Sequence, residues 1–101
     1  MSFPKAYRLV LSPKAERDIE QILRYTEETW GEAQAVVYHQ LLDDALRRLL
    51  EDPGVGRGSA DMPKTPLALP VGSHVVVYRV QGDTIGVVRV LHQRMSLPLH
   101  V

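Results

Sequence analysis

The sequence predicts an α+β fold in which a pair of helices packs on one β-sheet. Apolar residues recur at helical spacing through residues 13–51, which indicates two amphipathic helices in succession. Three valine- and leucine-rich runs follow a loop rich in proline and glycine, and a shorter run precedes the helices. The expected order is an N-terminal strand, a helical hairpin and a three-stranded antiparallel meander, with all strands in one sheet.

The N-terminal strand is expected over residues 6–11, which are rich in strand-forming side chains. Ser12 suits the N-cap of the helix that follows. Pro13 suits its first position, because the N–H that proline lacks would have no partner inside the helix. The helical pattern continues to about Thr29, and Trp30 falls on its apolar face.

A second helix is expected over residues 32–51, after an interruption at Gly31. So short a joint between two helices favours an antiparallel helical hairpin. Tyr25, Trp30 and Tyr38 flank this joint at helical spacing. We expect these rings in the core, because aromatic side chains bury large apolar areas.

A loop separates the helices from the later strands, because residues 53–66 contain three prolines and three glycines. Strands are expected over residues 67–71, 73–80 and 84–92, with a turn at residues 81–83. The last two strands carry apolar residues on both faces, so we place them centrally in the sheet. Pro70 marks the remaining strand as an edge or a strand end.

Length and composition fit one folded domain spanning residues 1–101. Hydrophobic residues make up 45% of the chain and charged residues 24%, which is typical of a globular protein. The 12 basic and 12 acidic side chains balance, so the chain lacks the positive excess that general nucleic-acid binding requires. The absence of cysteine excludes disulfides, thiolate zinc sites and thiol nucleophiles.

No stretch of the sequence has the length and apolar character of a membrane span or a signal peptide, so we expect a cytoplasmic location. A metal site built from His74, His92 and His100 is disfavoured. These residues lack regular ligand spacing and have no cysteine or carboxylate companion. We therefore expect neither a metal nor any other cofactor.

Three segments of the sequence resemble one family over nearly the whole chain. YRLVLSPKAERDIEQILRYTEETWGEAQA is similar to the opening strand and helices of ParE toxins, a branch of the ParE/RelE superfamily of bacterial toxins. LPVGSHVVVYRV resembles their central strand, and VVRVLHQRMSLPLHV resembles their last strand and tail. The chain departs from the family pattern at Ser96, where the family has an acidic residue. The resemblance implies a RelE/ParE-like fold.

The resemblance also implies an activity, because ParE-like toxins poison DNA gyrase by trapping it on cleaved DNA. Such a toxin acts by binding, so no catalytic residue is expected. The alternative is the activity of RelE-like relatives, which cut messenger RNA on the ribosome with positioned acid–base groups. Where those relatives place a basic residue on the central strand, this sequence has Val75 to Val77, and its tail lacks their tyrosine. The groups that could substitute are Tyr78, Arg79, Arg89, His92, Arg94 and His100.

Side chains of the last two strands and the tail are the candidates for contact with the target. They are Arg79, Arg89, His92, Arg94 and Met95. A plainer interpretation is that the two strand arginines pair with helix carboxylates. A three-residue loop would place Arg79 and Arg89 on one face of the sheet and a four-residue loop on opposite faces, since a one-residue shift of register reverses every side chain.

The resemblance implies a protein partner as well, a ParD-like antitoxin whose flexible segment folds onto the toxin in a hetero-oligomer. An amphipathic helix of such a partner needs an apolar groove on the toxin. Val36, Val37 and Leu41 lie off the main core stripe of the second helix and are the candidates for this groove. Alternatively, these residues pack on the first helix. A third hypothesis is a toxin-like domain that only binds its antitoxin.

Overall fold

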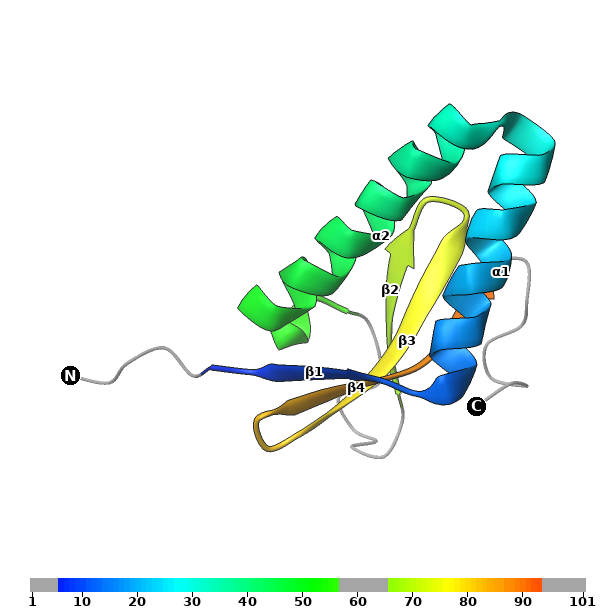
Figure 1. Cartoon of the computed structure of the whole chain (residues 1–101). Helices are drawn as coiled ribbons and strands as arrows, with labels where there is room; N and C mark the ends of the chain where they lie inside the picture. The colour runs from blue at the N-terminus through cyan, green and yellow to red at the C-terminus, as the bar shows by residue number, and fades with distance from the viewer. Residues whose placement is uncertain (1–5, 57–65, 94–101) are drawn as a thin grey trace.

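The elements of the computed structural model follow the order expected from the sequence (Figure 1). The structure describes residues 6–56 and 66–93. Its elements are β1 (Arg8–Leu11), α1 (Pro13–Trp30), α2 (Glu32–Glu51), the 3₁₀ helix η1 (Pro53–Val55), β2 (Leu67–Val71), β3 (His74–Gln81) and β4 (Thr84–His92). The expected α+β architecture of a strand, a helical hairpin and one sheet is confirmed.

All four strands form one sheet in the order β1-β4-β3-β2. β2, β3 and β4 make the expected antiparallel meander, and β1 pairs with β4 in parallel. β3 and β4 are therefore the central strands, as their apolar residues on both faces predict. Pro70 lies in the edge strand β2, where a residue without an N–H is tolerated.

Local capping explains where the helices begin and meet. Ser12 Oγ accepts a hydrogen bond from the N–H of Ala15 at 3.0 Å, which is the N-cap expected for α1. Gly31 links the helices with a φ of +96°, a conformation that favours glycine. Its N–H donates to the carbonyl of Glu27 at 2.9 Å and closes α1. Its own carbonyl accepts from the N–H of Ala35 at 3.1 Å and starts α2.

The main core lies between the helical hairpin and one face of the sheet. Leu49, Tyr78 and Ile85 are fully buried there. Tyr78 also fixes the segment after α2, because its hydroxyl donates to the carbonyl of Pro53 at 2.7 Å and accepts from the N–H of Gly56 at 2.8 Å. A 3₁₀ turn therefore occupies the beginning of the segment that we expected to be a loop.

Among the described residues, neither long helix is apolar enough to cross a membrane.

The β3–β4 hairpin combines a two-residue turn with a β-bulge. Gln81 pairs with Thr84 across the turn, whereas Val77 pairs with Arg89 beyond the bulge. The bulge inserts one extra residue into β4 and so shifts the register by one residue. Beyond the bulge, the strands therefore pair as they would after a three-residue loop without a bulge. Arg79 lies two residues from Val77 and consequently falls on the same face of the sheet as Arg89.

Two of the three aromatic side chains at the helical joint are not in the core. Tyr25 is 64% exposed and Trp30 is 70% exposed, whereas Tyr38 is half-buried. The expectation of buried rings is wrong for these two residues because the last turns of α1 extend beyond the end of the sheet (Figure 1).

Candidate functional site

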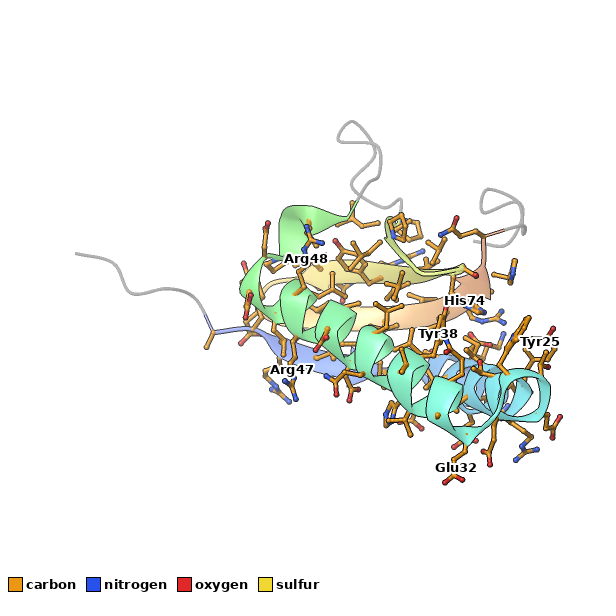
Figure 2. All side chains as sticks on the ribbon, turned by 90° about the horizontal axis from the view of Figure 1, so that it is seen from above. Tyr25, Glu32, Tyr38, Arg47, Arg48 and His74 are labelled. Atoms are coloured by element: carbon orange, nitrogen blue, oxygen red, sulfur yellow. The ribbon has the colours of Figure 1, made fainter. Side chains whose placement is uncertain are left out.

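A surface pocket of about 570 Å³, termed here the joint pocket, lies where the two helices meet. Its lining comes from the end of α1, from α2, from the β2–β3 turn and from the adjoining ends of β3 and β4. The residues are Tyr25, Thr26, Trp30, Gln34, Tyr38, Ser73, His74 and His92. Figure 2 shows Tyr25, Tyr38 and His74 together at this end of the molecule.

Tyr38 organises the inner wall of the joint pocket. Its hydroxyl donates to the carbonyl of Val71 at 3.2 Å, accepts from the N–H of Ser73 at 3.1 Å and contacts His74 Nδ1. Burial raises the pKa of Tyr38, so the phenol keeps its proton at neutral pH.

His92 contacts His74 edge to face, with ring centroids 5.2 Å apart. The two residues are cross-strand partners in β3 and β4, so the register explains the contact. Burial lowers the pKa of His74, and His92 lowers it further because two charged rings would repel. The described residues contain no group of three histidine, aspartate or glutamate side chains that could hold a metal ion.

Arg89 forms a bidentate ion pair with Asp18 of helix α1. Its Nε donates to Asp18 Oδ2 at 2.8 Å, and its Nη2 donates to Asp18 Oδ1 at 3.1 Å. Hydrogen bonding to this carboxylate raises the pKa of Arg89. The plainer interpretation of the strand arginines, pairing with a helix carboxylate, therefore describes Arg89.

Arg79 has different surroundings, because it is exposed on the sheet face turned away from the helices. Arg89 begins on the same face, but β1 pairs only with Thr84–Val87 of β4, so the Arg89 side chain passes the uncovered edge of β4 to reach Asp18. It lines a shallow pocket of about 250 Å³ together with Val10, Gln81 and Val88. An approaching protein would meet Arg79 directly. The candidates Arg94 and Met95, together with Ser96 and His100, lie outside the described residues.

The middle of the central strand β3 is apolar and buried. Val75 and Val77 form a small cluster with Leu91 on the face away from the helices, and Val76 belongs to the main core. Tyr78, one of the possible substitutes for a catalytic group, is fully buried, and its hydroxyl is occupied by backbone partners. None of these side chains can reach a substrate phosphate.

Three aliphatic side chains form an exposed stripe on α2, termed here the α2 stripe. Val36, Val37 and Leu41 are exposed by 65%, 59% and 42%. Val36 borders a surface groove of about 530 Å³ between the two helices. Leu41 lies beside the β2–β3 turn near Gly72. Val36 and Val37 are therefore mostly uncovered, although Val36 still borders α1 residues across that groove.

The sequence did not indicate His74 as part of this site, except as a disfavoured metal ligand. It also did not indicate that Tyr25 and Trp30 line a pocket. The signal that could have found His74 is the pairing of His74 with His92, but this pairing depends on the register of the hairpin. Of the target candidates, His92 lines the joint pocket, whereas Arg79 lies on the opposite side of the sheet.

Comparison with known proteins identifies the family. The family model for the ParE toxin of the type II toxin-antitoxin system parDE matches residues 9–97. This chain belongs to the ParE toxin family. Among ParE relatives, Toxin ParE1 of Mycobacterium tuberculosis is 42% identical over 91 residues, covering 89% of this chain and 93% of the relative. Toxin ParE1 of Caulobacter vibrioides is 37% identical over 97 residues, covering 96% and 98%.

The fold agrees with membership of the ParE family. A solved structure of the chromosomal ParDE toxin-antitoxin system from P. aeruginosa superposes with a TM-score of 0.73. The match covers 88% of this chain and 98% of that chain at 19% sequence identity, so it supports the fold alone. The resemblance seen in three sequence segments is confirmed, and the chain is a ParE-type toxin of a toxin-antitoxin system.

Proposed function

We propose that this ParE toxin inhibits bacterial growth by binding DNA gyrase and that a ParD-like antitoxin neutralises it by binding. The observation that most supports a binding toxin is the composition of β3. Val75 and Val77 lie where a RelE-like nuclease would need a basic group. A buried valine can neither accept nor donate a proton, so neither side chain can act as a general acid or base.

The proposed contact with gyrase is the sheet face around Arg79. Arginine is enriched at the energetically important positions of protein interfaces, where its planar group donates several hydrogen bonds. Here Arg79 stands beside the exposed side chain of Val10, so a cationic and an apolar contact are adjacent. The family pattern adds Arg94 and Met95 of the tail to this proposed contact.

The proposed contact with the antitoxin is the α2 stripe of Val36, Val37 and Leu41. Val37 and Leu41 are one helical turn apart, which is the spacing that a docked amphipathic helix contacts. Exposed aliphatic side chains grouped in this way are typical of a surface that a partner covers.

One experiment separates the two proposed surfaces by charge reversal at each. Arg79→Glu and Arg94→Glu are expected to abolish growth arrest, and both variants should still bind the antitoxin through the α2 stripe. Leu41→Glu is expected to weaken antitoxin binding at least about ten-fold, because the carboxylate would have to be buried in an apolar contact. Growth curves and calorimetry of the purified pair measure the two effects.

The matched control is Arg17→Glu, which reverses an exposed charge on α1 outside both surfaces. It should change neither growth arrest nor antitoxin affinity, and circular dichroism should show that every variant is folded. Full growth arrest by folded Arg79→Glu and Arg94→Glu variants would contradict the proposed target surface. An unchanged antitoxin affinity of Leu41→Glu would contradict the proposed antitoxin surface.

A further inference from the structure

Three side chains on the sheet face away from the helices are deeply buried, although both helices pack on the opposite face (Figure 1). Val75, Val77 and Leu91 are 6%, 2% and 3% exposed. Among the described residues, the partly buried apolar side chain packed against them is Ala68, which belongs to the sheet itself. Neighbouring strands shield a side chain only from the sides, so burial this deep requires a layer above the sheet. We term these four residues the outer cluster.

The chain leaves β4 beside the outer cluster. Leu91 and Val75 are cross-strand partners near the end of β4. Two residues after Leu91, Gln93 is fastened to the β2–β3 turn, because its N–H donates to the carbonyl of Ser73 at 2.9 Å. The tail, residues 94–101, therefore starts at the end of the sheet where the outer cluster lies.

Every second residue of the tail carries a large apolar side chain. In an extended chain alternate side chains point to the same side, so one side of an extended tail is apolar. Its residues are Met95, Leu97, Leu99 and Val101. Pro98 has no N–H to give to a strand ladder and disfavours a helix. The tail is therefore better suited to lie over a sheet face than to extend the sheet by one strand.

The tail is long enough to cross the outer cluster. An extended chain spans at most about 3.3–3.6 Å per residue, so residues 94–101 reach up to about 26–29 Å. Neighbouring strands lie about 4.8 Å apart, so the way from β4 across β3 to β2 is only about 10 Å. The tail can therefore cover the outer cluster without being fully extended.

Two other segments lie outside the described residues, and neither matches the outer cluster as well. Residues 57–65 contain one large apolar side chain, Met62. Residues 1–5 lead towards β1, which pairs with Thr84–Val87 at the other end of β4 from Leu91. The tail combines the apolar side chains and the starting point that the outer cluster requires.

We propose that residues 94–101 fold back over the outer cluster, with the apolar side of the tail against the sheet. Arg94 then lies on the same face of the molecule as Arg79, so the two arginines belong to one target surface. Only this consequence rests on the proposed function. The docking of the tail follows from the burial of the outer cluster and can be measured on the isolated toxin.

The first test measures whether the tail shields the outer cluster from a thiol reagent. The chain has no cysteine, so Val75→Cys places a single thiol in the outer cluster, and Val76→Cys places one in the main core on the other face of β3. Each thiol is labelled with a maleimide in the full-length chain, with and without the double substitution Leu97→Ser and Leu99→Ser. We expect the double substitution to speed labelling of Val75→Cys at least about ten-fold and to leave labelling of Val76→Cys unchanged.

The matched control is the double substitution Ser96→Ala and His100→Ala, which alters the other side of the tail and should change neither rate. An unchanged labelling rate of Val75→Cys in the serine variant would overturn the proposal. Equal acceleration at both thiols would also contradict it, because the tail leucines would then stabilise the whole fold. If Met62→Ser speeds labelling of Val75→Cys and the serine variant does not, residues 57–65 cover the outer cluster and the tail assignment is wrong.

The second test joins the tail to the sheet through a disulfide, which forms only where two Cα atoms come within about 7 Å. Ala68→Cys is combined with Leu97→Cys or with Leu99→Cys, and mild oxidation is followed by mass spectrometry. We expect at least one of these pairs to form an intramolecular disulfide. Ala35→Cys, on the helical hairpin, is the control and should form none with either tail position.

Failure of both pairs with Ala68→Cys, or equal cross-linking with Ala35→Cys, would refute the docked tail. Both tests use the isolated toxin, so a negative result leaves the proposed target untouched. Conversely, a toxin that does not act on gyrase could still show the shielded thiol and the disulfide.

Discussion

Among single residues, Asp18 ties α1 to β4 with one carboxylate. It accepts two hydrogen bonds from Arg89, and its Oδ2 also accepts from the N–H of Val90 at 2.9 Å. The Asp18 side chain is only 13% exposed, so these donors take the place of water around the charge. A carboxylate satisfied in this way stabilises the fold. Removing it leaves the N–H of buried Val90 and the part-buried Arg89 guanidinium without this acceptor.

Asp18→Ala is therefore expected to lower the free energy of unfolding by about 2–4 kcal/mol. Urea unfolding followed by circular dichroism measures this change. Asp43→Ala is the matched control, because Asp43 pairs with His39 at 3.8 Å and both side chains are far more exposed. The control should cost less than about 1 kcal/mol. A similar small loss in both variants would show that the Asp18 contacts do not stabilise the protein.

His74 makes stability depend on pH, because burial and the neighbouring His92 lower its pKa below the ordinary value of 6.5. As pH falls below 6.5, the unfolded chain takes up a proton at this histidine more readily than the folded protein does. Stability is therefore full above 6.5 and is lost as pH falls through the lower folded pKa. The groups around His74 are Tyr38, His92, Tyr25, Arg89 and Asp18.

In a series from about pH 8 to about pH 5, His74→Gln is expected to flatten the part of the pH dependence of unfolding free energy that lies below 6.5. Urea unfolding across this range measures the slope. His39→Gln provides the control, because His39 is an exposed histidine on α2 and its removal should leave the slope intact. If His74→Gln and the parent protein lose stability equally on acidification, another group must carry the effect.

Some residue roles could be predicted from the sequence, and others depend on the surroundings. The Ser12 cap was predictable because capping is a local property of two or three neighbouring residues. The exposure of Tyr25 and Trp30 was not, since helical periodicity assigns a face but does not say how far the opposing sheet extends. The contact of His74 with His92 needed the strand register, which the sequence left open.

Among the elements, the β2–β3 turn is the one that shapes the joint pocket. Gly72 has a φ of +56°, and a Cβ there would lie 2.8 Å from the hydroxyl oxygen of Tyr38. Gly82 in the β3–β4 turn has a similar φ of +61°, but a Cβ there would meet nothing within 4 Å. The two turns share a backbone conformation and differ in whether a side chain crowds the glycine.

Gly72→Ala is consequently expected to destabilise the protein by about 1–3 kcal/mol more than Gly82→Ala does. Both substitutions place a side chain in the left-handed region, so the difference isolates the contact with Tyr38. Thermal unfolding measures the stabilities, and the fluorescence of Trp30 reports whether the pocket changes. Equal destabilisation by the two alanines would show that Tyr38 moves aside without cost.

The bounds of most elements were predictable because strong local signals mark them. Gly31 precedes α2, and Pro53 follows it, so the expected and observed helix both span Glu32–Glu51. The bulge in the β3–β4 hairpin was not predictable. The extra residue is Val88, which follows another valine in the strand. It is neither a glycine nor a polar residue, so nothing in the sequence marks it as the site of a bulge.

For the whole molecule, the topology separates the two proposed contact surfaces. The helices cover one face of the sheet (Figure 1). The α2 stripe therefore lies on that side of the molecule, while Arg79 lies on the other. An antitoxin that begins on α2 must therefore extend around the molecule to block the face around Arg79. A flexible segment that folds on binding can do this, because such a segment covers large and curved surfaces.

The central claim is that this ParE toxin acts by docking on gyrase and not by cutting RNA. The most direct measurement adds the purified toxin to gyrase with supercoiled DNA and, in parallel, to a translating extract with end-labelled messenger RNA. The docking account predicts linear DNA trapped on gyrase and intact messenger RNA. Messenger RNA cut at codons while the DNA stays supercoiled would contradict it.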